Sequence, residues 1–142
     1  MGGQNLAGRA RSRPSPRPIA SSQSAPQNSA GNLEALWSVE FRTFGAWVRG
    51  GVVAVEPQRL IGGDNHYYYL GTYSVVRNAI RAKVRVAHFN GPTRRRLGQS
   101  ETYFEVRIVG ELHGEQIVGI VYKSDAPSVQ IPLRLIRQSD LP

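Results

Sequence analysis

Apolar and polar residues alternate with a period of two along most of the chain from Leu36 onward. This pattern is typical of β-strands that bury one face and expose the other. It is clearest over residues 80–88, where Ile80, Val84 and His88 share the apolar face and basic residues occupy the other. Shorter segments of the same kind predict further strands over residues 37–42, 48–55, 59–61, 67–73, 104–108, 116–122 and 129–135.

Short turn segments separate these predicted strands. Glu56-Pro57-Gln58 and Asp125-Ala126-Pro127 each contain a proline, which fixes φ and removes a backbone donor. No window of about 12 residues sustains a helical period. Because consecutive strands joined by short turns pair as hairpins, and closure removes exposed edges, we expect an all-β fold, an antiparallel up-and-down barrel of about eight strands. Pro132 cannot donate to a ladder, so we expect the last strand to have an edge or seam there.

Two glycine pairs interrupt the alternation of apolar and polar residues. Gly50 and Gly51 lie inside a predicted strand, where they favour a bend, a bulge or a close backbone approach. Gly62, Gly63 and Asp64 predict a structural turn, in which the glycines permit positive φ and the Asp64 carboxylate accepts backbone N–H bonds.

Residues 1–33 differ in composition from residues 34–142. They contain four arginines and no acidic residue, and they are rich in Pro, Ser, Gly, Gln and Ala. Such a segment has too little apolar surface to offset the entropy of ordering it. We therefore expect a disordered basic tail, dispensable for folding, followed by one domain over residues 34–142.

The net charge of +8 comes from 18 basic and 10 acidic residues. Four of the positives lie in the tail without counter-charge, which leaves +4 for the domain. The chain has no cysteine, which excludes disulfides, thiol catalysis and thiolate metal sites and fits a reducing compartment, here expected to be the cytoplasm. No run approaches the ~18 apolar residues of a membrane span, so no membrane association is expected.

The segment from Gly62-Gly63-Asp64 through Tyr67-Tyr68-Tyr69 to Tyr73 resembles the GrlR-like family, small regulators named for a negative regulator of type III secretion. The opening strand over residues 36–41 and the glycine and valine strand over residues 50–55 also match the family pattern. The resemblance covers most of the domain and none of the tail. It implies a lipocalin-like eight-stranded barrel that forms a homodimer. It also implies a non-catalytic role, in which the protein binds a helix-turn-helix transcriptional activator and holds it inactive.

In the founding member of that family, an acidic turn after the tyrosine strand is associated with partner binding. The matching turn here is Val75-Val76-Arg77-Asn78, which has no acidic residue. The resemblance therefore implies the fold, but this turn predicts a partner of different charge, either an acidic protein surface or the same face of a second copy in a dimer. The candidate partner-binding residues are those of this turn and the basic face of the next strand: Val75, Val76, Arg77, Asn78, Arg81, Lys83 and Arg85.

Two other binding functions remain open. In the first, the barrel holds a small apolar ligand in a cavity lined by Trp37, Phe41, Val84, Val86, Phe104 and Leu133. In the second, the basic face binds nucleic acid through phosphate contacts. The tyrosine strand has two interpretations. In the favoured structural one, Tyr67, Tyr69 and Tyr73 line one face and Tyr68 the other, and they contribute core and interface area. In the functional one, they form a stacking platform for bases or line an aromatic pocket.

We expect no enzymatic activity, cofactor or metal. Asp64 and His66 are two residues apart, but a third metal ligand is not evident, and an Asx turn explains Asp64 better. His88 is expected to be buried and hydrogen-bonded, and His113 to lie in a turn. Neither shows the spacing of a catalytic triad with the serines of the chain.

Overall fold

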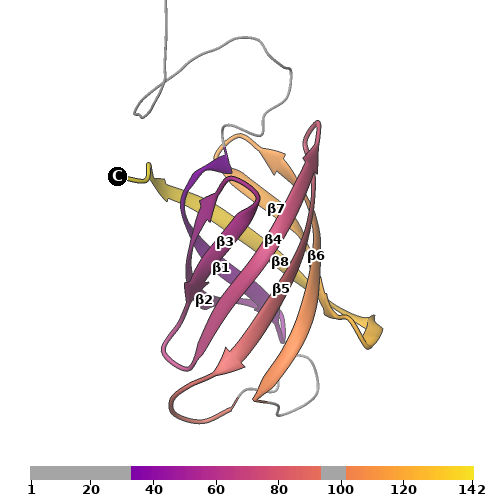
Figure 1. Cartoon of the computed structure of the whole chain (residues 1–142). Helices are drawn as coiled ribbons and strands as arrows, with labels where there is room; N and C mark the ends of the chain where they lie inside the picture. Colours follow the sequence, from indigo (N-terminus) through magenta and orange to yellow (C-terminus); the bar gives the residue numbers. More distant parts are fainter. Residues whose placement is uncertain (1–32, 94–101) are drawn as a thin grey trace, which may run out of the picture.

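The computed structural model describes residues 33–93 and 102–142. These residues form an all-β barrel in which every strand pairs antiparallel with its sequence neighbours, and the last strand pairs with the first (Figure 1). The predicted fold class is thus confirmed. The eight strands of this described part are β1 (Ala35–Thr43), β2 (Ala46–Glu56), β3 (Arg59–Gly63), β4 (Tyr67–Val76), β5 (Ala79–His88), β6 (Tyr103–His113), β7 (Gln116–Lys123) and β8 (Ala126–Ser139).

Alternate side chains of each strand point inward and fill the interior of the barrel. Along β5 the buried and exposed positions alternate from Ala79 to Val86, as the period of two predicts. Trp37 and Leu133 are among the most deeply buried side chains, at 0% and 1% exposure. The indole N–H of Trp37 donates to the carbonyl oxygen of Leu33 at 2.8 Å, which satisfies its polar atom inside the apolar core.

That contact moves the start of the packed domain. The predicted tail includes Leu33, but its side chain is only 1% exposed and belongs to the core cluster. The polar composition of the residues before it predicts a tail, so Leu33 is a buried apolar residue that this composition does not indicate at the boundary between tail and domain. The rest of the predicted tail, residues 1–32, lies outside the described residues.

Gly50 and Gly51 form a β-bulge against β1. Ser38 pairs with Val52 and Glu40 with Arg49, so two glycines oppose the single residue Val39. Gly51 has φ of +91°, and a Cβ there would lie 2.0 Å from the carbonyl oxygen of Gly63. A Cβ at Gly50 would lie 2.2 Å from the ring of Phe41. The predicted bulge and the predicted close approach thus both occur.

Gly62 and Gly63 have a different role from the one predicted. They are the last residues of β3 rather than turn residues, and neither has a positive φ. A Cβ at Gly62 would meet the carbonyl oxygen of Val52 at 2.1 Å, and one at Gly63 would meet that of Tyr67 at 2.6 Å. These glycines are therefore required by the close approach of β2 and β4 on either side, and not by backbone conformation.

The seam between β1 and β8 closes the barrel. It runs from Leu36 opposite Ser139 to Phe41 opposite Leu133. Pro132, the next residue, pairs only on its β7 side, with Ile120. The proline therefore lies just beyond the seam, where its missing N–H leaves no gap in the β1 ladder, as predicted.

Candidate anion-binding site

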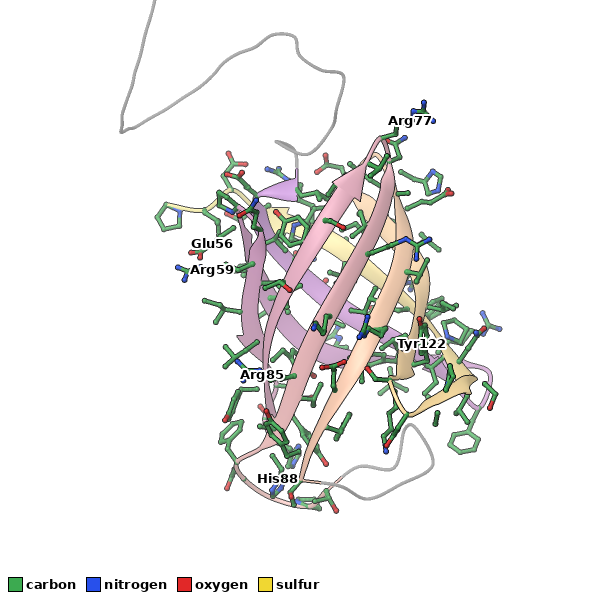
Figure 2. The ribbon with its side chains drawn as sticks, turned by 45° about the vertical axis from the view of Figure 1, so that its right-hand side comes forward. Glu56, Arg59, Arg77, Arg85, His88 and Tyr122 are labelled. Atoms are coloured by element: carbon green, nitrogen blue, oxygen red, sulfur yellow. The ribbon has the colours of Figure 1, made fainter. Side chains whose placement is uncertain are left out.

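Three cations follow the outer face of β5. Arg81, Lys83 and Arg85 are exposed and alternate with the buried residues of the same strand. Figure 2 shows Arg85 low on the outer face of β5, Arg77 at the tip of the β4–β5 hairpin and His88 near the opposite end of the barrel. Within residues 33–93 and 102–142, these three side chains form no hydrogen bond or ion pair. Their charge is therefore available to a ligand.

The register of the sheet adds residues that the sequence alone did not place beside these cations. Thr72 of β4 pairs with Lys83, Lys83 pairs with Arg107 of β6, and Arg107 pairs with Tyr122 of β7. These four residues form one continuous row across the outer face of β4, β5, β6 and β7, which is called the wall from here on. Lys83 and Arg107 are therefore like charges in directly opposite positions, an arrangement that destabilises a sheet.

A hollow of about 310 Å³ opens over this row. Its polar lining consists of hydroxyl and cationic side chains from four adjacent strands, and no carboxylate of the described residues lines it. Hydroxyl, ammonium and guanidinium groups all donate hydrogen bonds, so the lining is suited to an oxyanion. The polar lining residues on the outward-facing parity of the strands are Thr72, Ser74, Arg81, Lys83, Arg107 and Tyr122, while the hydroxyl of Tyr73, which also lines the hollow, donates to the carbonyl oxygen of Glu56.

One carboxylate lies at the rim of the wall. Glu105 Oε2 accepts hydrogen bonds from the Ser124 hydroxyl at 2.6 Å and from Arg107 Nε at 3.2 Å. The bond from Ser124 lowers the pKa of Glu105 below its ordinary value, and Arg107 and Lys83 lower it further. The positive potential of the wall therefore stabilises the ionised form of Glu105, and this carboxylate neutralises part of the wall's positive charge at one side.

The turn at the upper end of the wall contains the other predicted partner-binding residues. Val76, Arg77 and Asn78 are exposed at the hairpin tip, and Arg77 adopts φ of 58°. Val75 instead points inward and packs against the core. The tip thus presents a valine, a cation and an amide, with no carboxylate among Val75–Asn78.

Asp64 forms the Asx turn that the sequence predicted. Its Oδ1 accepts the backbone N–H groups of His66 and Tyr67, both at 2.8 Å. The hydroxyl of Tyr69 lies 3.1 Å from Oδ2 and 2.8 Å from the carbonyl oxygen of Gly50, so its proton has two acceptors. Asp64 thus links the turn to the β2 bulge. No group of three potential metal ligands occurs in the part of the chain that the structure describes.

The six ligand-cavity candidates all face the barrel interior. Trp37, Val84, Val86 and Leu133 belong to the buried core, and Phe41 and Phe104 pack against it. The structure thus brings them together as core residues of the barrel.

Lys123 is an interior cation that the sequence analysis missed. It continues the inward parity of Ile117 and Val121, and its side chain is 3% exposed. Nζ lies 5.7 Å from the ring centroid of Phe104 and 3.8 Å from Asp125 Oδ1. The predicted strand over residues 116–122 stops one residue short of Lys123, although the alternation of β7 continues to it.

A second hollow lies at the upper end of the barrel and differs in its charges. Its cations already have partners: Arg59 pairs with Glu56 at 2.5 Å, and Arg137 pairs with Asp140 at 2.6 Å. Burial and the nearby Glu56 carboxylate raise the pKa of Glu34, which also lines this hollow. It therefore offers a ligand less unpaired charge than the β4–β7 wall does.

A comparison with models of known families and a search of curated proteins both find no match. The GrlR-like assignment therefore stays a prediction from the residues quoted above. Among the described residues, no helix has the length and apolar character needed to cross a membrane.

Proposed function

We propose that this protein is a non-catalytic binding protein whose outer wall over β4–β7 engages an anionic partner. The observation that most supports this proposal is the Lys83–Arg107 pair. These like charges lie in directly opposite positions under a hollow that is lined by hydrogen-bond donors. Glu105 at the rim neutralises part of this charge through its contact with Arg107, and the remaining like charges of Lys83 and Arg107 oppose each other across the two strands. An oxyanion bound over it would accept hydrogen bonds from both cations and cancel their repulsion.

The charge of the wall selects among partners. A basic DNA-binding domain, the partner that the family resemblance implies, would meet like charge along β5 and at Arg77. Carboxylate and phosphate groups would instead find complementary donors in Thr72, Arg81 and Lys83. This site would allow the protein to bind a transcriptional regulator if that regulator presents an acidic surface to the wall.

The test is a charge reversal on the full chain. The variant Arg81→Glu/Lys83→Glu/Arg85→Glu should bind fluorescein-labelled polyphosphate at least 30-fold more weakly than wild type in an anisotropy titration. All three side chains are exposed, so the fold should be retained, which far-UV circular dichroism would verify.

Arg49→Glu provides the matched control, because Arg49 is exposed on β2 outside the wall and the substitution changes charge by the same amount per site. We expect it to change the affinity less than 3-fold. A triple variant that folds and binds polyphosphate as tightly as wild type would contradict the proposed function.

A further inference from the structure

We infer that the anionic partner is an extended single strand of nucleic acid, whose phosphates follow β5 and whose bases stack on aromatic residues at the lower end of the wall. The inference rests on the proposed function and specifies its ligand. It combines the basic line of β5 with a second feature, a group of exposed aromatic rings, that the proposed function leaves unused.

The exposed rings continue the wall beyond the cations. Tyr68 of β4 and Tyr103 of β6 both pair with Ala87, which follows Arg85 on the outer face of β5. Tyr68 is 43% exposed and Tyr103 is 62% exposed, while the small side chain between them is buried. Phe89, 57% exposed, lies with its ring centroid 6.4 Å from that of Tyr68.

Tyr68, Tyr103 and Phe89 form a group at one end of the wall rather than single scattered residues, and this group adjoins a row of cations. An acidic peptide would use the cations, but it presents a flat group to these rings only where its sequence has an aromatic residue. A single strand of nucleic acid uses both features, because every nucleotide carries a phosphate and a π face. The combination therefore favours nucleic acid over an acidic protein.

The spacing of the cations supports an extended strand. Arg81, Lys83 and Arg85 are successive outward residues of one β-strand, so their Cα atoms are about 6.6 Å apart, twice the rise per residue. Successive phosphates in an extended single strand have a comparable separation. Duplex would present phosphates to the cations but would keep its bases stacked away from Tyr68 and Tyr103.

The experiment measures anisotropy of fluorescein-labelled dT12 and rU12, with a duplex of the same length as comparison, on the full chain. We expect at least one of the two single strands to bind 10-fold or more tightly than duplex, and the dT12 and rU12 arms to show which sugar is preferred. Three phosphate contacts predict a slope of about −2 for log K against log salt concentration.

The aromatic contribution is tested with Tyr68→Ala/Tyr103→Ala. Stacking of a base on one ring typically contributes about 1–3 kcal/mol, so the double variant should lose 10-fold or more in affinity for the single strand. Phe44→Ala is the control, since Phe44 is a fully exposed ring at the β1–β2 turn, and it should leave binding unchanged. Tyr103→Ala alone, at the more exposed ring, should lose at least 3-fold and serves if the double variant does not fold.

Two outcomes overturn this inference while leaving the proposed function intact. One is equal affinity for single strand and duplex, and the other is unchanged affinity in folded tyrosine variants, each with polyphosphate binding still dependent on Arg81, Lys83 and Arg85. Loss of that dependence would instead overturn the proposed function, and the inference with it.

Discussion

The guanidinium of Arg134 lies over the indole of Trp47, with its central carbon 4.2 Å from the ring centroid. Arg134 Nε also donates to Glu40 Oε1 at 2.5 Å, so one arginine connects β8, β1 and β2 on the outside of the barrel. The second tryptophan, Trp37, is inside the barrel and fully buried. The two indoles therefore stabilise the fold by different means, one by core packing and the other by a surface cation–π contact.

The first prediction compares these tryptophans. Trp37→Ala should lower the free energy of unfolding by about 3–5 kcal/mol, the usual loss for a large buried aromatic. Trp47→Ala should cost about 1 kcal/mol, because a partly exposed cation–π contact is worth about 0.5–1 kcal/mol. Urea unfolding followed by far-UV circular dichroism measures both. Equal losses in the two variants would contradict the placement of Trp37 in the core.

The second prediction concerns Gly62. A Cβ at this position would lie 2.1 Å from a backbone oxygen of β2, which cannot move without breaking the ladder. Gly62→Ala should therefore destabilise the domain by 3 kcal/mol or more, at the upper end of overpacking effects of about 1–3 kcal/mol. Gly45→Ala is the control: φ there is +80°, but no atom lies within 4 Å, so only backbone strain of about 1–2 kcal/mol is expected. A smaller loss at Gly62 than at Gly45 would show that β2 and β3 separate easily.

The third prediction concerns pH. The pKa of Glu105 is lowered in the folded protein, chiefly by the Ser124 hydroxyl, from an ordinary value of 4.5. A lowered pKa means that ionised Glu105 favours the folded state. Its contribution to stability is therefore complete above pH 4.5 and is lost as the pH falls through the folded-state pKa.

Ser124→Ala should raise the pKa of Glu105 toward its ordinary value, as followed by NMR titration of the side-chain carboxyl carbon. Ser128→Ala, at an exposed serine of β8, should leave that titration unchanged. A Glu105 that titrates identically in wild type and Ser124→Ala would show that the hydroxyl does not hold the carboxylate.

The fold could be predicted from the sequence because each strand buries one face. The resulting period of two identifies both the strand and the residues that point inward. Trp37, Val84 and Leu133 were assigned inward on that basis and lie in the core. The Asx turn at Asp64 followed equally from local chemistry. Leu33 lies at the end of a segment whose composition predicts a tail, and Lys123 lies one residue beyond the predicted strand over residues 116–122, so neither was predicted to be in the interior.

The candidate site was predictable only in part. The β5 cations belong to one strand, so their common face follows from parity alone. Thr72, Arg107 and Tyr122 lie beside Lys83 only through the register of four strands, and a shift of one residue would turn each of them inward. The role of Gly62 likewise depends on the neighbouring strands, which a single segment of sequence does not specify.

The seam between β1 and β8 has a consequence for synthesis of the chain. Glu40 and Arg134, which meet across it, are 94 residues apart in sequence. On the ribosome, β1 therefore has no second neighbour until β8 has emerged, and the loop-closure entropy of nearly the whole domain must be lost in one late step. Until then the nascent chain exposes two open sheet edges. That interval, rather than the finished barrel, is the stage at which chaperones would have most to protect.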